Sequence, residues 1–454
     1  MALRIVLINP AFYDGNEYKN RFDAYLDWIK GGNLYVAPFE PPLGLAYLSS
    51  ALKAAGDDVT LLDMQGELMD SAELERRIRE LQPDLVGITA MTPTLPEALR
   101  VAEIVRASVS STKIVLGGVH PTLDPESVLA NPAVDFVIRG EGEVALAELA
   151  LAIETDGDLD WVDGLSRREN GAIHVRPKAR PIADMDDLPL ADYDAFPIER
   201  YIEHNAHLRN MRGISMLISR GCPYRCTFCA VHQTMGRKWR PRSPDRVVDQ
   251  IIDLRDRFGI EGVWFKDSIF NINRQWVERF SEQMVSRKVN VTFQALTRVD
   301  LIREPELELL VRAGLTQLDL GIEAGSERIL AKLHKGITPA RIRTQVALAK
   351  KHVKVFGFFM IGIPGETEDD VLRTFELAKE LELDRWTWSI YSPLPGSALY
   401  DELVRDGRVL PSNLQHTAIH FTEAYEGICE IPPGRLKELY REINDYFYQR
   451  RVAA

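Results

Sequence analysis

Two long stretches of the chain alternate apolar runs of strand length with amphipathic segments of helix length, and this alternation restricts the possible folds most. In the first stretch the apolar runs are residues 4–10, 57–64, 84–90, 113–118 and 135–140. The helical patterns between them are residues 43–55, 71–81, 95–107 and 143–154. Strands that alternate with helices form parallel, doubly wound sheets. We therefore predict an α/β fold with a Rossmann-like domain at residues 1–154, whose ligands bind beyond the carboxyl ends of the strands.

A second alternation begins at Gly213 and predicts a second α/β domain. Its apolar runs are residues 213–219, 262–266, 289–296, 317–323, 354–363 and 386–392. Helical patterns such as residues 246–258 and 371–383 separate them. Six strand–helix units suit a partial (β/α)6 barrel at residues 209–398 better than a flat sheet. Residues 155–208, which are rich in Asp and Pro, are predicted to be a connector, and residues 399–454 a small helical cap.

Composition excludes several classes of partner. The formal net charge is −12, which argues against a nucleic-acid partner and is compatible with a cationic substrate. No apolar run reaches the length of about 18 residues that a membrane span needs, so no membrane partner is expected. The first ten residues have the pattern of a buried strand and not of a secretory signal. We therefore expect a cytoplasmic protein.

Three of the four cysteines lie within eight residues, in the segment RGCPYRCTFC that follows the first strand of the second domain. Thiolates at Cys222, Cys226 and Cys229 can bind three irons of a cubane cluster and leave the fourth iron open to a substrate group. Zinc would ordinarily take a fourth Cys or His, and His232 keeps that alternative open. Cys429 is far along the chain and is not expected to be a ligand. The clustering suits a metal centre in a reducing compartment.

This C-x3-C-x2-C loop, with Phe228 just before the last cysteine, resembles the radical S-adenosylmethionine (SAM) superfamily. The resemblance implies that Cys222, Cys226 and Cys229 hold a [4Fe–4S] cluster whose open iron binds the methionine end of SAM. It implies further that Phe228 packs near the adenine. An electron from a flavodoxin- or ferredoxin-type reductant would then cleave SAM to a 5′-deoxyadenosyl radical.

The downstream motifs resemble the SAM-binding elements of the same family. Asp267 and Ser268, in FKDS at the end of the second strand, stand where the family contacts the SAM amino group. Glu323, in GIEAG, matches a strand-end carboxylate that accepts from the ribose hydroxyls. Arg298 is expected to reach the SAM carboxylate. Ile363, in GIPGE, stands in the turn that reads the adenine edge.

Alternation along two strands of the second domain predicts a polar interior. Residues 289–298 place Asn290, Thr292 and Gln294 on one face, opposite apolar neighbours. Gln317, Asp319 and Glu323 share a face in the same way. Because helices should cover the outer face, the polar side chains are expected inside the barrel, with Gln294 among the cofactor-binding residues.

The first domain resembles the cobalamin-binding domain that precedes the barrel in one large radical SAM group. Residues 41–48 (PPLGLAYL), 117–122 (GGVHPT) and 139–143 (RGEGE) carry that likeness. Cobalamin is therefore a possible cofactor. However, residues 63–68 (DMQGEL) lack the histidine that binds cobalt in Asp-x-His-x-x-Gly patterns, and His120 is more typical of a structural hydrogen bonder. We expect from this that the domain is a scaffold and that turnover does not require cobalamin.

The chain also resembles the radical SAM diol-dehydratases of aminoglycoside antibiotic biosynthesis. That likeness implies radical dehydration of a small-molecule substrate, a cationic amino-sugar diol. The alternatives are a cobalamin-dependent radical SAM C-methyltransferase and a non-enzymatic iron–sulfur or zinc sensor. Dehydration needs an acid or a base, and Asp319 and Tyr391 are the candidate catalytic residues. Trp386 and Trp388 are expected to pack in the core.

Overall fold

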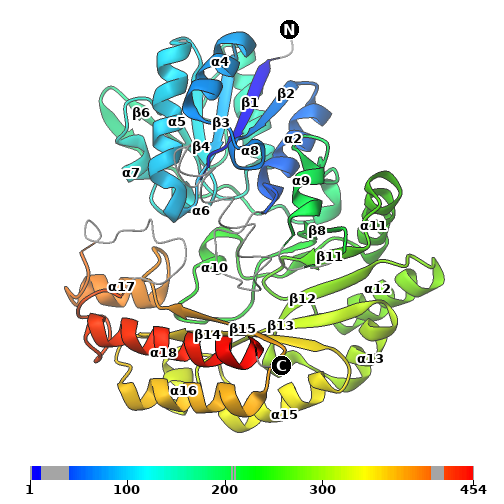
Figure 1. The fold of residues 1–454 in the computed structure, drawn as a ribbon. Coiled ribbons are helices and arrows are strands. Elements are labelled where there is room, and N and C mark those ends of the chain that lie inside the picture. Colours follow the sequence, from blue (N-terminus) through cyan, green and yellow to red (C-terminus); the bar gives the residue numbers. More distant parts are fainter. Residues whose placement is uncertain (1–2, 12–39, 206–207, 209–210, 411–423, 453–454) are drawn as a thin grey trace. The chain divides into compact units, whose positions relative to one another are not determined.

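The computed structural model describes residues 3–11, 40–205, 208, 211–410 and 424–452. The chain divides into two compact units, which are described separately (Figure 1). The first unit is Met1–Ser215 with Gln233–Gly236 and Arg240–Arg242, and the remaining residues form the second. None of the helices in the described ranges combines the length and the apolar character needed to cross a bilayer.

The first unit is built on a seven-stranded sheet with the order β2-β1-β3-β4-β5-β6-β7. Its strands are β1 (Arg4–Asn9), β2 (Asp58–Asp63), β3 (Leu85–Thr89), β4 (Lys113–Gly117), β5 (Phe136–Ile138), β6 (Leu165–Glu169) and β7 (Ala172–His174). The five strands from β2 to β5 pair in parallel, as the alternation predicts. The strand order reverses between β1 and β3, and such a switch point is where doubly wound sheets bind their ligands.

Helices cover both faces of this sheet. They are α2 (Leu43–Ala55), α3 (Met64–Glu67), α4 (Ser71–Leu81), α5 (Leu95–Ser108), α6 (Val119–Leu123), α7 (Pro125–Leu129), α8 (Gly142–Glu154) and α9 (Ile198–Glu203). α2 packs against α8, and α4 packs against α5. Ile5, Leu7 and Ile8 of β1 are at most 1% exposed, which is why the strand sequence is apolar throughout and does not alternate.

The predicted connector at residues 155–208 contains regular structure that sequence reasoning missed. β6 and β7 extend the sheet as an antiparallel hairpin. The two residues that join them, Asn170 and Gly171, have positive φ values of 49° and 80°. This is the backbone of the two-residue turn that favours Asn-Gly, because it matches the twist of the flanking strands. The Asn-Gly pair was therefore the signal for the hairpin.

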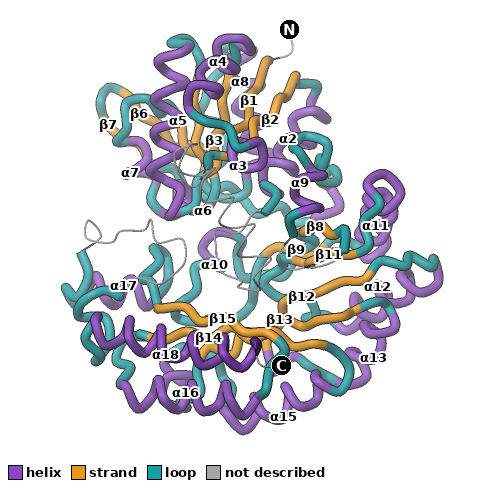
Figure 2. Tube along the Cα trace, viewed as in Figure 1, coloured by secondary structure: helices purple, strands orange, loops and turns teal. Residues whose placement is uncertain are grey.

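The second unit holds the six-stranded sheet β8-β11-β12-β13-β14-β15, whose spatial order follows the sequence. Its strands are β8 (Gly213–Met216), β11 (Gly262–Phe265), β12 (Thr292–Arg298), β13 (Leu315–Glu323), β14 (Lys354–Ile361) and β15 (Arg385–Ile390). The helices are α11 (Pro244–Phe258), α12 (Arg274–Ser286), α13 (Glu304–Arg312), α14 (Glu327–Lys332), α15 (Pro339–Lys350), α16 (Glu368–Leu381), α17 (Ala398–Arg405) and α18 (Pro433–Val452). Helices α11, α12, α13, α15 and α16 lie outside the strands (Figure 2), which confirms the partial barrel.

The outer faces of the barrel strands carry the aromatic core. Phe265 of β11 and Phe293 of β12 pack with Phe280 of α12, with ring centroids 5.4–6.0 Å apart. On the last strand, Trp386 and Trp388 pack against Phe447 of α18. Trp388 is thus a core residue, as expected, whereas Trp386 is half-buried against the same helix. The C-terminal segment contains α17 and α18.

One predicted strand begins later than expected. β12 starts at Thr292, and Asn290 stands before it with a positive φ of 54°. The predicted polar face therefore keeps Thr292 and Gln294 but loses Asn290. A positive φ is tolerated best by Asn and Gly and does not belong to an extended strand, so this position ends the preceding turn.

Candidate active site

The cysteine loop follows β9 (Ser219–Arg220), and its three cysteines are half-buried. Thr227, in the middle of the loop, ties it to the turn after α14. Its backbone N–H donates to the Leu333 carbonyl at 3.2 Å, and its hydroxyl donates to the Lys332 carbonyl at 2.9 Å. The Thr227 carbonyl accepts from Leu399 N–H at 2.9 Å. The loop is therefore held in place by protein contacts alone, which prepares the thiols for a ligand.

The three thiols lie close enough to affect one another electrostatically. Burial raises the pKa of Cys222, and burial raises the pKa of Cys229 to about 11. The charge of Cys226 adds to both shifts, whereas Arg298 and Lys335 lower the pKa of Cys222. Neighbouring thiolates that repel one another need a compensating cation, and a bound iron cluster supplies it. The donor set thus fits a cluster with three protein ligands.

The alternative to a cluster is a zinc site that includes His232. Within the described ranges, no group of three or more His, Cys, Asp and Glu side chains is arranged to hold a metal ion. Cys429 lies outside the loop in sequence, and its Sγ atom contacts the Ile431 carbonyl at 3.4 Å. The choice between a cluster and zinc therefore rests on the C-x3-C-x2-C spacing.

Arg298, at the end of β12, lies directly over the cysteine loop and is 6% exposed. Its Nη1 atom is 3.4 Å from Cys226 Sγ, and its guanidinium lies 3.8 Å from the ring centroid of Tyr224. Nε and Nη2 donate to the Asp300 carboxylate at 2.9 and 3.2 Å, and Nη2 also donates to the Lys335 carbonyl. Four of the five N–H groups of an arginine are thus engaged, which leaves one for the SAM carboxylate.

Glu323 ends β13 at an irregularity of the sheet. The pairing with β14 shifts between Gly321 and Glu323, and Glu323 has a positive φ of 67°. Its Oε1 atom accepts from Lys335 Nζ at 3.1 Å. Bulges at strand ends redirect a side chain, and here the carboxylate stands near the cysteine loop, where its charge raises the pKa of Cys229. The ribose contact of Glu323 stays a prediction.

Lys335 is a site residue that sequence reasoning missed. Its side chain is 4% exposed and pairs with Glu323, and its carbonyl accepts from Arg298. The only local signal is the turn that carries it, because His334 and Gly336 on either side both have positive φ. That signal predicts a turn but does not show that the lysine is buried.

We expect Glu323→Gln to weaken SAM binding by roughly 10- to 100-fold while the cluster still forms. A charge-assisted hydrogen bond contributes about 1.5–3 kcal/mol, and the amide cannot supply the charge. Calorimetric titration of the cluster-loaded protein with SAM measures the loss. Glu327→Gln, at an exposed position in the first turn of α14, is the matched control. An unchanged SAM affinity in a folded, iron-loaded Glu323 variant removes Glu323 from the site.

Asp267 is fully buried and holds the start of the cysteine loop. Its Oδ1 atom accepts from the Ser219 N–H and hydroxyl, both at 2.5 Å, and from Ile218 N–H at 3.2 Å. Burial raises its pKa to about 7. The carboxylate is thus engaged in positioning backbone, and its contact with the SAM amino group stays a prediction. Ser268 is exposed beside it.

Ile363 lies in a turn that Glu366 closes. Glu366 accepts from the N–H groups of Gly362 and Ile363, the latter at 3.0 Å, and its own N–H donates to the Ile363 carbonyl at 2.8 Å. The N–H of Ile363 is therefore engaged within the protein, and only its carbonyl retains a lone pair for the predicted adenine contact. Burial raises the pKa of Glu366 to about 8.

The raised pKa of Glu366 predicts a pH dependence of stability. Between the ordinary value of 4.5 and about 8, the folded chain holds this proton and the unfolded chain does not. The free energy of unfolding of the wild type, relative to Glu366→Gln, should therefore fall as pH rises through this window, by at most about 1.4 kcal/mol per pH unit. Denaturant unfolding at several pH values measures it. Glu376→Gln, at an exposed glutamate of α16, serves as the control. A relative free energy that is flat from pH 4.5 to 8 contradicts the assignment.

Gln294 and Asp319 belong to a buried polar network inside the barrel. Gln317 Nε2 donates to Gln294 Oε1 at 3.1 Å and to Asp319 Oδ1 at 2.7 Å. Trp264 Nε1 donates to Asp319 Oδ2 at 2.9 Å. Burial raises the pKa of Asp319 to about 6, although the charges of Arg385 and Lys266 lower it. The polar interior predicted from alternation is therefore present, and its members satisfy one another.

Tyr391, the other predicted catalytic residue, lies in different surroundings. It follows β15, is 2% exposed, and donates its N–H to the Ile361 carbonyl at 2.7 Å. Burial raises the pKa of Tyr391, and the charge of Glu402 in α17 raises it further. Asp319 and Tyr391 therefore do not form an acid–base pair through the contacts described.

The carboxyl edge of the first unit's sheet is closely packed with polar groups. Asp63, at the end of β2, accepts from Tyr201 Oη at 2.6 Å and from Asn9 Nδ2 at 2.8 Å. The ring nitrogens of His120 contact the hydroxyls of Thr92 and Ser127 at 3.2 and 3.3 Å, and burial lowers the pKa of His120. His120 is thus a neutral structural hydrogen bonder, as predicted.

Gly118 shapes the same edge, where the turn after β4 meets the end of β3. Its φ is 102°, and a Cβ atom would lie 2.9 Å from both the Ala90 carbonyl and Thr89 Oγ1. The neighbouring backbone is held by hydrogen bonds from Ala90 to Gly117 at 2.9 Å and from His120 to Ala90 at 3.1 Å. Only glycine permits this approach without strain. Gly118 therefore lets the turn after β4 pack closely against the end of β3 at the carboxyl edge of the sheet.

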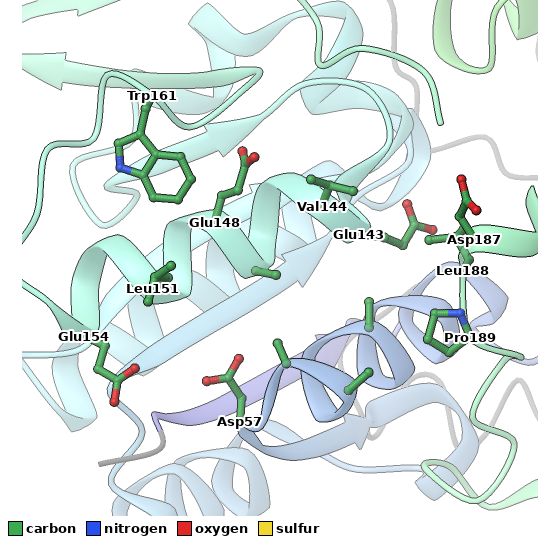
Figure 3. A pocket seen from close by; sticks show the side chains of 14 residues that line it. Asp57, Glu143, Val144, Glu148, Leu151, Glu154, Trp161, Asp187, Leu188 and Pro189 are labelled. Atoms are coloured by element: carbon green, nitrogen blue, oxygen red, sulfur yellow. The ribbon is translucent and has the colours of Figure 1, made fainter. Parts of the chain in front are cut away.

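A separate pocket of about 530 Å³ lies between α2 and α8 in the first unit (Figure 3). Alanines of both helices line it, and Trp161 and Leu151 stand beside them. Carboxylates such as Glu148 and Glu154 point from α8 at its rim. Its walls come from helices and loops and not from the carboxyl ends of the strands, so it is distinct from the expected ligand edge.

Comparison with known proteins agrees with this geometry. The sequence model of the B12 binding domain matches residues 29–150, and that of the Radical SAM superfamily matches residues 216–378. An uncharacterized methyltransferase of Pyrococcus horikoshii is 33% identical over 375 residues, which are 82% of this chain and 80% of the relative. An anaerobic magnesium-protoporphyrin IX monomethyl ester cyclase of Rubrivivax gelatinosus is 30% identical over 381 residues, 82% of this chain and 68% of the relative.

A solved structure shows the same fold over both domains. The radical SAM methyltransferase TsrM from Kitasatospora setae, with cobalamin and a [4Fe–4S] cluster bound, superposes with a TM-score of 0.71 and 20% identity, covering 89% of this chain and 75% of that chain. A loop of three cysteines at the mouth of a six-stranded half-barrel defines a radical SAM enzyme. The chain belongs to the radical SAM superfamily, in the group that carries an N-terminal cobalamin-binding-like domain.

Proposed function

We propose that the protein is a cobalamin-dependent radical SAM methyltransferase that acts on a small organic substrate and receives its electron from a flavodoxin- or ferredoxin-type protein. The observation that carries the proposal is that one chain contains both a three-thiol loop and a doubly wound sheet whose strand order reverses between β1 and β3, with the Gly118 turn on the same carboxyl edge. The relatives named above support it, because two are methyltransferases and the third is a cyclase. They favour methyl transfer over the dehydration that we expected from sequence.

The first unit fits cobalamin better than the scaffold role predicted from sequence. That prediction rested on Gln65 standing where some cobalamin proteins have a histidine, and a missing lower ligand does not prevent the corrin ring from binding. The residues that would hold it lie at the ends of β1, β3 and β4: Asn9, Thr89 and Gly118. His120 would not bind cobalt, because hydroxyls occupy both of its ring nitrogens. Cobalamin, when bound, would supply a carrier for the methyl group.

The second unit contributes the radical site through its own side chains. Asp267 fixes the backbone before the cysteine loop, and Thr227 fixes its middle. Glu323, held by Lys335, presents a carboxylate that would orient the SAM ribose. The Asp319 network gives the barrel interior buried polar groups that hydrogen-bond one another.

The test supplies anaerobic, cluster-loaded enzyme with SAM whose methyl group is deuterated, a reductant, and fractionated small-molecule extracts. We expect a product in which one hydrogen of the substrate is replaced by a trideuteromethyl group. No such product should form when cobalamin is withheld throughout growth and assay. A product that has lost water, formed equally well without cobalamin, overturns methyl transfer in favour of dehydration. Ring closure without gain of label overturns it in favour of a cyclase.

A further inference from the structure

We propose that Arg298 sets the reduction potential of the cluster by donating a hydrogen bond to the sulfur of Cys226. The inference rests on cluster binding by Cys222, Cys226 and Cys229, and not on which reaction follows. Reduction of the cluster precedes substrate chemistry. A failure of this proposal would therefore not contradict methyl transfer, and a failure of methyl transfer would not contradict this proposal.

The guanidinium is fixed so that one nitrogen points at a ligand sulfur. Nη1 is 3.4 Å from Cys226 Sγ. The opposite side of the group is clamped by Asp300, whose two oxygens accept at 2.9 and 3.2 Å, and by the Lys335 carbonyl. The Tyr224 ring lies 3.8 Å from the guanidinium carbon. With three kinds of contact on a side chain that is 6% exposed, Arg298 cannot turn away from the sulfur without breaking them.

The hydrogen bond from Arg298 to Cys226 Sγ is the contact through which this side chain acts on the cluster. Asp300 balances the positive charge of the guanidinium, and Glu323 balances that of Lys335. A donor to a thiolate sulfur withdraws charge from the cluster and is strengthened when an electron is added. Hydrogen bonds to the sulfurs are among the factors that set iron–sulfur potentials. Arg298 should therefore stabilise the reduced cluster and make the potential less negative.

A less negative reduction potential makes the cluster easier to reduce. The negative charges of three half-buried thiolates oppose the addition of an electron. A donor aimed at Cys226 offsets part of that repulsion, so a protein reductant can load the cluster more readily. Arg298 acts through the ligand and is thus a positioning residue with an electronic role, in addition to its one N–H left for SAM.

The experiment is an EPR-monitored redox titration of reconstituted protein without SAM. Arg298→Met removes the charge and the bond, and Arg298→Lys keeps the charge but cannot serve Asp300, Lys335 and Cys226 together. At the wild-type midpoint, the ratio of oxidised to reduced cluster should rise at least about threefold in the Met variant, a shift of about 30 mV to more negative potential for one electron. The Lys variant should fall between the two.

Arg303→Met is the matched control, because this arginine pairs with Glu306 and its side chain is 48% exposed. Its midpoint should equal that of the wild type. Iron content, measured on every sample, separates loss of cluster from a change in potential. If the Met variant loads too little iron for a titration, the midpoint potential of the Lys variant tests the proposal. A midpoint that is unchanged or more positive in the iron-loaded Arg298 variants overturns the proposal.

Discussion

Alanine at any one of Cys222, Cys226 or Cys229 is expected to remove both the iron–sulfur absorbance of the reconstituted protein and all formation of 5′-deoxyadenosine from SAM. Each thiolate would bind one iron of the cluster, so the loss of any one leaves an iron without its protein ligand. The effect should be complete, because without the cluster no electron reaches SAM. Anaerobic absorbance spectra and chromatographic assay of 5′-deoxyadenosine measure it.

Cys429→Ala is the control within the same chain. Cys429 is half-buried like the loop cysteines, but its sulfur contacts the Ile431 carbonyl and its neighbour is Glu366. This variant should keep the absorbance and the cleavage of SAM. A loop variant that keeps both, or a Cys429 variant that loses both, contradicts the ligand assignment.

A methyl group at Gly118 should weaken the binding of cobalamin by the first unit. The added Cβ of Gly118→Ala would press on the Ala90 carbonyl and Thr89 Oγ1, so the turn after β4 must move away from β3. The positive φ adds a cost of about 1 kcal/mol to folding. We expect corrinoid affinity, measured by equilibrium dialysis, to fall at least about tenfold, the equivalent of about 1.4 kcal/mol.

Gly56→Ala is the matched control for strain. Gly56 has a φ of 100°, but its Cβ position meets no atom within 4 Å, and it ends α2 away from the carboxyl edge. Gly118→Ala should lose more thermal stability than Gly56→Ala, because only its Cβ meets neighbouring atoms, and only Gly118→Ala should lose cobalamin. Equal binding by the two variants, at wild-type affinity, contradicts a cofactor at this sheet edge.

Much of the fold could be predicted because each parallel strand is buried on both faces. The apolar runs that become β1 to β5 and β11 to β15 stand out against amphipathic helices for that reason. The hairpin of β6 and β7 was missed because its strands are short, β6 is buried only at its first two residues, and β7 is exposed along its whole length. Its one strong signal was the Asn170-Gly171 pair.

The site was predictable where motif and local geometry coincide, and less so where distant residues converge. The cysteine loop is contiguous, so its spacing alone indicates a cluster. Lys335 enters the site through a turn, and sequence gives no sign that its side chain is buried against Glu323. Asp267 and Ile363 occupy motif positions, but each forms hydrogen bonds with neighbouring residues of the protein. Such hydrogen bonds depend on the packed structure and not on spacing.

Cofactor binding by the first unit could not be predicted from a single residue. Gln65 in place of histidine suggested an empty scaffold, but a single side chain decides only how cobalt is liganded. Binding of the corrin ring depends on the whole sheet edge. Backbone approach at Gly118 and strand order at β1 and β3 shape that edge, and neither can be read from one missing residue.

The most direct test of the central claim is anaerobic reconstitution with iron and sulfide, followed by metal analysis and incubation with SAM and a strong reductant. The account predicts about four irons and four sulfides per chain, no requirement for zinc, and reductive cleavage of SAM to 5′-deoxyadenosine. A protein that binds a single zinc ion, retains no sulfide and leaves SAM intact would contradict it.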